Sequence, residues 1–166
     1  LAPENPGQTR FGDLLWLSSF VLRSPDARFG GFSGLSLSPD GEMLYAVSDR
    51  GHWLSVRLHH DAQGRLSHMD RWTMGPLRQP DGRAMKGRQR DAEALVRLPD
   101  GAWLVAFEQD HRLWRYPPSA TVFARLPVLV PLPAEVMRAP FNGGMEAVTR
   151  LRDGGVLVLT ESMKNA

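Results

Sequence analysis

Two stretches of this chain are near copies of each other, and a third fits the same pattern. Residues 93–108 and 146–161 both begin with Glu-Ala and continue through an apolar run, Asp-Gly and a second apolar run that ends before a glutamate. Residues 33–49 fit with a serine in place of the first glutamate and one extra residue after the glycine. Self-similarity at a long period indicates a repeat architecture, so one supersecondary unit is expected several times.

Each copy predicts a β-hairpin, because Asp-Gly between apolar runs is the strongest short-range hairpin signal. The second runs, at residues 43–47, 103–107 and 156–159, are almost continuously apolar and are typical of strands covered on both faces. Alternating runs at 53–58 and 112–116 predict third strands. Weaker fourth strands are expected at 66–73 and, interrupted by Pro127, at 122–130. A single helical turn is expected at 134–138.

Four antiparallel strands per repeat, about every 50 to 60 residues, are the plan of a β-propeller blade. We therefore predict an all-β, incomplete propeller over residues 11–166, preceded by a flexible segment at 1–10. It would hold about two and a half to three four-stranded blades of a six-bladed ring. We expect the ring to be incomplete because the chain is truncated at its C-terminus. The alternative is that a second chain closes the ring. Open apolar sheet edges would then favour self-association.

The composition narrows the class of protein. A hydrophobic content of 42% with 23% charged residues is ordinary for a soluble globular domain. No apolar run is long enough to predict a membrane span, and the first residues resemble a mature or trimmed terminus rather than a leader. The absence of cysteine excludes disulfides and thiolate catalysis. Since the net charge is only +2 and the basic residues are interspersed with acids, no nucleic-acid partner is predicted.

One loop departs from this even distribution of charge. Residues 78–90 hold five basic side chains in thirteen positions. Guanidinium groups bind phosphate through paired hydrogen bonds, so this loop is a candidate anion site. The alternative is a solvated loop, as most basic runs are.

The recurring acids are expected at one place. A six-residue strand rises roughly 20 Å, so the acids before the first strand and after the second both fall at the open end of each hairpin. On inner strands they would gather at one mouth of the propeller channel and repel one another if unpaired. Calcium, which takes about six to eight oxygen ligands, would neutralise them. Arg50 and Arg90 adjoin acids and are the other option. A third is a structural role, in which the acids only hydrogen-bond between blades. The candidate metal ligands are Asp49, Asp91, Glu93, Glu108, Glu146 and Glu161.

Two histidines follow these acids at the same offset. His52 lies three residues after Asp49, and His111 lies three residues after Glu108. Either could act in general acid–base catalysis at the open end, or simply form part of a surface loop.

Three ordered blocks carry a family resemblance. They are residues 29–35 with 48–51, residues 90–95 with Glu108, and residues 142–148 with Glu161. With these blocks the chain resembles the phytase-like family, named for the esterase-like activity of phytase, over most of residues 10–161 and about the N-terminal half of the family's domain. The resemblance implies an exported bacterial propeller, secreted or periplasmic after removal of a signal peptide.

The resemblance also implies a metal-dependent hydrolase of small-molecule phosphoesters or esters, with calcium as cofactor. Asp49, Glu93 and Glu146 would then be the catalytic acids, and Arg50, Lys86 and Arg90 would hold the substrate phosphate. Two alternatives stay open. One is a lactonase-type ester hydrolase with one channel metal and an amide such as Asn142 among the ligands. The other is a binding or scaffold propeller without metal or turnover.

Overall fold

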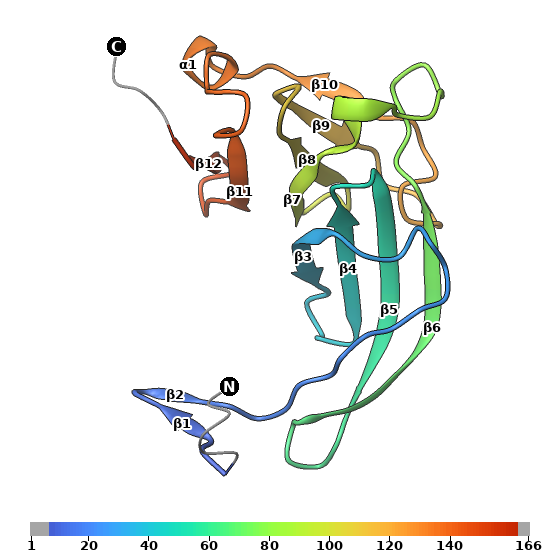
Figure 1. Cartoon of the computed structure of the whole chain (residues 1–166), viewed down its shortest axis with the longest axis vertical. Coiled ribbons are helices and arrows are strands. Elements are labelled where there is room, and N and C mark those ends of the chain that lie inside the picture. Colours follow the sequence, from blue (N-terminus) through green and yellow to red (C-terminus); the bar gives the residue numbers. More distant parts are fainter. Residues whose placement is uncertain (1–6, 163–166) are drawn as a thin grey trace.

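The computed structural model describes residues 7–162, which are mostly strand and connecting loop. The first large sheet is an antiparallel meander in the order β3-β4-β5-β6 (Figure 1). Its strands are β3 (Phe32–Leu37), β4 (Met43–Ser48), β5 (His52–His60) and β6 (Leu66–Pro76). The predicted hairpin and the third strand are confirmed, and the fourth strand is longer than expected.

The second sheet repeats the meander in the order β7-β8-β9-β10. Its strands are β7 (Ala92–Arg97), β8 (Trp103–Phe107), β9 (Arg112–Tyr116) and β10 (Val128–Val130). The fourth strand begins only after Pro127, because proline has no N–H to donate to a neighbouring strand. The prediction of a strand starting at residue 122 was therefore too long. The third unit is the hairpin of β11 (Met145–Arg150) and β12 (Val156–Thr160).

Short elements complete the described part of the chain. A 3-10 turn η1 (Gly87–Arg90) precedes β7, and the helical turn α1 (Ala134–Met137) lies where one was predicted. β1 (Arg10–Phe11) pairs with β2 (Leu14–Leu15) in a small separate hairpin. Residues 1–6 of the predicted flexible segment lie outside the described residues. In the described chain, no helix has the length and apolar character needed to cross a bilayer.

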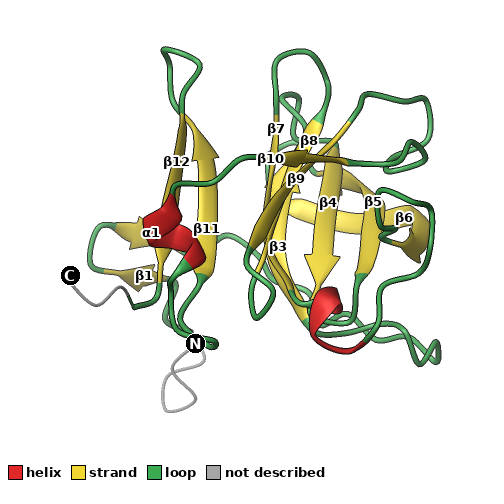
Figure 2. Ribbon diagram, turned by 90° about the horizontal axis from the view of Figure 1, so that it is seen from above, coloured by secondary structure: helices red, strands yellow, loops and turns green. Residues whose placement is uncertain are grey.

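The three units follow one another along an arc, and their first strands lie on its concave side (Figure 1). β7 contacts both β3 and β11, so the first strands of successive units are neighbours. Figure 2 shows the β11–β12 hairpin standing beside the second sheet. The all-β class and the four-stranded antiparallel sheets are thus confirmed, while closure into a six-bladed ring stays a prediction.

The core lies in two layers, one on each face of the second sheet. Between the first and second sheets, aromatic residues such as Tyr45 and Trp53 pack with Trp103 and Phe107. On the other face, small and branched side chains meet Met145 and Val148 of β11. Every residue of β8 is buried, as its continuous apolar run predicted.

β12 differs from β8 although its sequence is as apolar. Leu157 is 45% exposed and Leu159 is 58% exposed. Their side of the hairpin has no further sheet against it in the described part of the chain. The prediction that residues 156–159 are covered on both faces was therefore wrong for this structure.

Arg112 fixes the loop that leads into β7. Its side chain is buried between the rings of Phe107 and Trp114, with the guanidinium carbon 4.0 and 4.4 Å from the ring centres. It donates hydrogen bonds to the carbonyl oxygens of Gln89, in η1, and Asp110. One buried cation therefore ties the end of η1 to the second sheet, directly before Asp91 and β7.

Gly34 allows β3 and β7 to approach closely. A Cβ added there would lie 2.9 Å from both the Cα of Ala94 and a methyl carbon of Val47. Since the Ala94 contact is with backbone, a side-chain rotation cannot relieve it. Gly34→Ala is expected to destabilise the fold by about 1–3 kcal/mol, the usual cost of overpacking. Urea unfolding measures this, with Ser36→Ala on the same strand as the control. Equal stability of the two variants would contradict the close approach.

Candidate metal centre

A β-bulge occurs at the same place in each first strand. The register of the three hairpins shifts between Phe32 and Gly34, between Ala92 and Ala94, and between Met145 and Ala147. The residues inside these shifts are Ser33, Glu93 and Glu146. A bulge redirects a side chain relative to the pleat of its strand. The repeat therefore places one polar side chain per unit at the open end of its hairpin.

The second acid of each repeat directly follows the second strand. Three equivalent backbone hydrogen bonds hold this position: Asp49 N to Gly31 O at 2.9 Å, Glu108 N to Asp91 O at 2.9 Å and Glu161 N to Gly144 O at 3.0 Å. Both acids of a repeat thus lie at the end of the hairpin opposite the Asp-Gly turn, as the strand lengths predicted.

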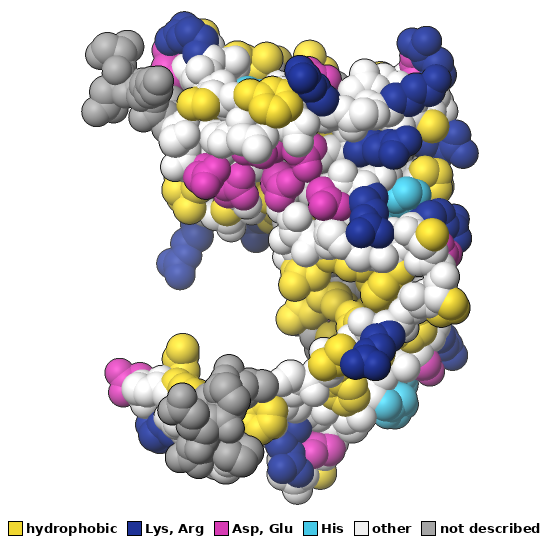
Figure 3. Space-filling model, in the orientation of Figure 1, with side chains coloured by type: hydrophobic (Ala, Val, Ile, Leu, Met, Phe, Trp, Pro, Cys, Tyr) yellow, Lys and Arg dark blue, Asp and Glu magenta, His cyan; other side chains and the backbone are white. Residues whose placement is uncertain are grey.

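Five carboxylates come together there in two groups that share one member. Asp91, Glu93 and Glu108 offer oxygens within 4.8 Å of one another, and so do Glu108, Glu146 and Glu161. Acidic side chains form one patch near the ends of β7 and β11 (Figure 3). Each group has the donor chemistry of a site for a hard divalent cation.

The proximity of these acids shows in their pKa values. Partial burial raises the pKa of Glu93 to about 7, with the Asp91 and Glu146 carboxylates adding to the rise and Ser33 opposing it through a hydrogen bond. Burial and the neighbouring Glu108 carboxylate likewise raise the pKa of Glu146. Such shifts arise where several carboxylates share a site and no cation compensates them.

Among the described residues, the more deeply placed acids form no ion pair. Asp91 and Glu108 are each only 8% exposed. Of the nine ion pairs found among residues 7–162, none includes one of the five clustered carboxylates. Buried carboxylates normally pair with a cation or coordinate a metal. The donor set therefore fits a bound cation.

Glu108 also connects two units of the fold. Its Oε1 accepts a hydrogen bond of 2.8 Å from the backbone N–H of Gly144, which precedes β11. This is the kind of contact between sheets that a purely structural role predicts. One side chain thus both joins the second sheet to the third unit and belongs to both acidic groups.

Asp49 lies apart from these groups. Its carboxylate sits over Gly31, where an added Cβ would come within 1.8 Å of Oδ1, and its nearest cation is Arg50 at 3.9 Å. In the first repeat a serine replaces the first glutamate, so this end of the cluster carries fewer acids. The roles proposed for Asp49 as ligand and catalytic acid stay predictions.

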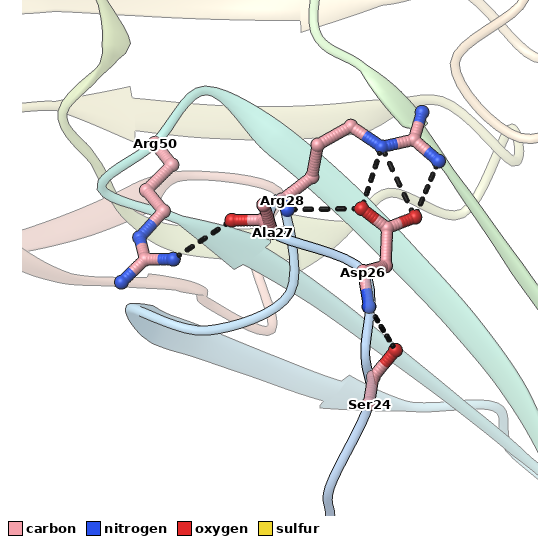
Figure 4. A network of polar contacts seen from close by, with 5 residues as sticks. All are labelled: Ser24, Asp26, Ala27, Arg28 and Arg50. Carbon is pink, nitrogen blue, oxygen red and sulfur yellow. Dashed lines mark hydrogen bonds and ion pairs between the residues drawn. The ribbon is translucent and has the colours of Figure 1, made fainter.

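The predicted phosphate-binding residues are held by backbone carbonyls or lie on the surface. Arg50 donates to the carbonyl oxygens of Ala27 and Phe29, beside the ion pair between Asp26 and Arg28 (Figure 4).

The other two predicted phosphate-binding residues, Lys86 and Arg90, lie at the two ends of η1. Arg90 donates to the Met85 carbonyl at 3.2 Å, and its side chain packs against Gly51. Lys86 is exposed and lines a cavity of about 420 Å³ together with Arg83 and Gln89. Their roles in phosphate binding stay predictions.

Two residues beside the acidic groups were not predicted from the sequence to take part in the site. Ser33 opposes the rise in the pKa of Glu93 from the neighbouring first strand, and Gly144 bonds Glu108 from 36 residues away. Alignment of the repeats signals Ser33, because it occupies the position of Glu93 and Glu146. No local pattern signals the contact of Gly144.

Comparison with known proteins gives one family match. The family described as "Phytase-like: Esterase-like activity of phytase" matches residues 27–164. This extent does not correspond to the expected N-terminal half of the family's domain. No curated protein matches the sequence.

Three chains of solved structures are similar to this chain, among them the following two. A luciferin-regenerating enzyme shares 16% identity with a TM-score of 0.44, over 78% of this chain and 37% of that one. A Bacteroides uniformis protein described as a candidate 6-phosphogluconolactonase shares 20% identity with a TM-score of 0.46, over 87% of this chain and 52% of that one. The chain thus spans between about a third and a half of the length of these two proteins.

Proposed function

The chain belongs to the phytase-like family, and we propose that its acidic centre binds calcium and serves the hydrolysis of a small-molecule phosphoester. The observation that carries the proposal is the group of five carboxylates without a cationic partner among the described residues. Burial and mutual repulsion make this arrangement unfavourable in the absence of a cation. A divalent ion would remove both costs.

The five acids divide into two groups that would each hold a cation. Asp91 and Glu93 would bind on one side, Glu146 and Glu161 on the other, with Glu108 common to both. A bound divalent ion polarises a phosphoryl oxygen and lowers the pKa of water. Calcium suits an all-oxygen donor set better than transition metals, which favour nitrogen or sulfur ligands.

The chain's own groups would do the rest. Glu93 or Glu146, each redirected by its bulge, would orient the attacking water and accept its proton, while the bond from phosphorus to the leaving oxygen breaks and the leaving alkoxide takes up a proton from water. Lys86 and Arg90 lie at the two ends of η1, which directly precedes Asp91, and their charges would suit the non-reacting phosphate oxygens. Arg50 would need to exchange its bonds to the Ala27 and Phe29 carbonyls to join them.

We also propose that the units are blades of a six-bladed β-propeller. The neighbouring first strands on the concave side support this proposal, because the inner strands of propeller blades lie side by side around the channel. The exposed apolar residues of β12 would be covered in such a ring, or by a second copy through the open edge. Export to the periplasm or the medium is part of the proposal, because extracellular calcium sites work at the roughly millimolar end of the affinity range.

Calcium titration by calorimetry on the full chain tests this function. We expect saturable binding with a Kd below about 1 mM, the weak end of protein calcium sites. Hydrolysis of inositol phosphates should then depend on calcium and stop with chelator. Binding weaker than that limit would refute the metal centre and leave a scaffold role for the acids. Calcium-dependent turnover of lactones with none of phosphoesters would instead establish the lactonase-type activity.

A further inference from the structure

We propose that His111 is a positioning residue, which holds the loop before β11 so that the Gly144 N–H stays bonded to Glu108. No catalytic contact is assigned to it. The consequence for the metal centre rests on the proposed function, whereas the consequence for the loop does not.

His111 is bound to that loop through one ring nitrogen. The side chain is only 8% exposed, and its Nε2 lies 3.2 Å from the Ala139 oxygen and 3.1 Å from the Pro140 oxygen. Both partners are carbonyl groups, which only accept, so Nε2 must carry the proton. The second sheet thus holds the 139–140 segment through the side chain of His111, the residue directly before β9.

The imidazole also fills the space over Gly144. A Cβ added at Gly144 would lie 2.4 Å from Nδ1 and Cε1 of His111 and 3.0 Å from Cγ of Glu108. The Gly144 peptide is therefore enclosed by the histidine ring and the glutamate chain. Its N–H is directed at Oε1 of Glu108, at 2.8 Å. Movement of the loop away from the ring would lengthen this bond.

Packing alone does not explain a histidine here. Its Nδ1 is buried and has no hydrogen-bond partner among residues 7–162. An unpaired buried nitrogen reduces stability, so an apolar ring would fill the same volume at lower cost. What an apolar ring cannot supply is the donor to the two carbonyls, and we infer that this donor is the function of His111.

Two substitutions separate the donor from the ring. His111→Phe keeps a planar ring and removes the donor, while His111→Gln supplies an amide NH₂ that can reach carbonyl oxygens. His59→Phe is the control. His59 bonds Asp70 through Nε2. It lies near the C-terminal end of β5, away from the acidic groups.

The first measurement needs no metal. Hydrogen exchange of the peptide containing Gly144, with chelator present, should be at least about tenfold faster in His111→Phe and near wild type in His111→Gln and His59→Phe. Unchanged exchange in His111→Phe would overturn the inference. Equal acceleration in His59→Phe would also overturn it, because the effect would then be a general loss of stability.

The second measurement concerns the metal centre. Calcium affinity should fall about 10- to 100-fold in His111→Phe, as for loss of groups that orient metal ligands. His111→Gln should recover most of it. Equal affinities in wild type and His111→Phe would overturn the role at the centre. If wild type binds no calcium, the proposed function fails, and the exchange measurement still decides whether His111 holds the loop.

Discussion

Replacing Glu108 by glutamine is expected to weaken calcium binding about a hundredfold, because affinity at such sites depends on the number of charged ligands. Glu108 is the one carboxylate common to both acidic groups, so its charge acts on either bound ion. Glutamine keeps the side-chain length and a carbonyl oxygen, which can still accept from Gly144. The packing between the second sheet and β11 should survive, and the loss should appear in affinity rather than in folding.

Two further substitutions provide calcium affinities with which the loss in Glu108→Gln can be compared. Glu161 belongs to only one group and is exposed, so Glu161→Gln should cost about tenfold. Glu42 lies near the Asp-Gly turn, paired with Arg57, and Glu42→Gln should leave calcium affinity unchanged. All three are compared with wild type by calorimetry at pH 7.5. Equal losses for Glu108→Gln and Glu161→Gln would contradict the shared role of Glu108.

The sequence predicts the position of these acids along their strands because that position depends on local geometry. Strand length and the Asp-Gly turn determine which end of a hairpin Glu93 and Glu108 occupy, and the structure has them at that end. The bulge at Glu93 was not predicted. It arises from the pairing of two strands, and one strand's residues do not reveal it.

Contacts between units were harder to predict. The approach of Glu108 to Gly144 and the enclosure of His111 depend on how the second sheet packs against β11, which no short pattern encodes. The same limitation applies to Asp49. Its repeat position is equivalent to that of Glu108, yet its shorter side chain ends over Gly31 and outside both groups.

For β12, the prediction of a strand was correct and the prediction of burial was wrong. Its apolar run has the composition of a strand covered on both sides, and periodicity alone does not reveal whether the covering sheet is present. Leu157 and Leu159 are therefore predicted correctly as strand residues and incorrectly as core.

Calcium affinity is expected to fall about 25-fold between pH 7.5 and pH 5.5 from Glu93 alone, because binding must displace a proton from a carboxyl group with a pKa of about 7. The metal-free protein should show the opposite trend in stability. The folded-state pKa of Glu93 lies above its usual value of 4.5, so the folded protein binds the extra proton. This contribution is fully present below about pH 4.5 and is lost as the pH rises through about 7. Saturating calcium should abolish this decline, because Glu93 is then ionised in both the calcium-bound folded state and the unfolded state.

Glu93→Gln isolates this contribution from other titrating groups. His52 opposes it, since burial lowers the pKa of that ring and stability then rises as the pH approaches 6.5. The quantity to measure is therefore the difference between wild type and Glu93→Gln, in calcium affinity by calorimetry and in thermal stability with chelator. Glutamine cannot ionise, so the variant should lose most of the pH dependence of binding and show weaker affinity at pH 7.5. A wild-type affinity independent of pH from 5.5 to 7.5, or the same slope in both proteins, would show that Glu93 does not ionise on binding calcium, and its place among the ligands would then be wrong.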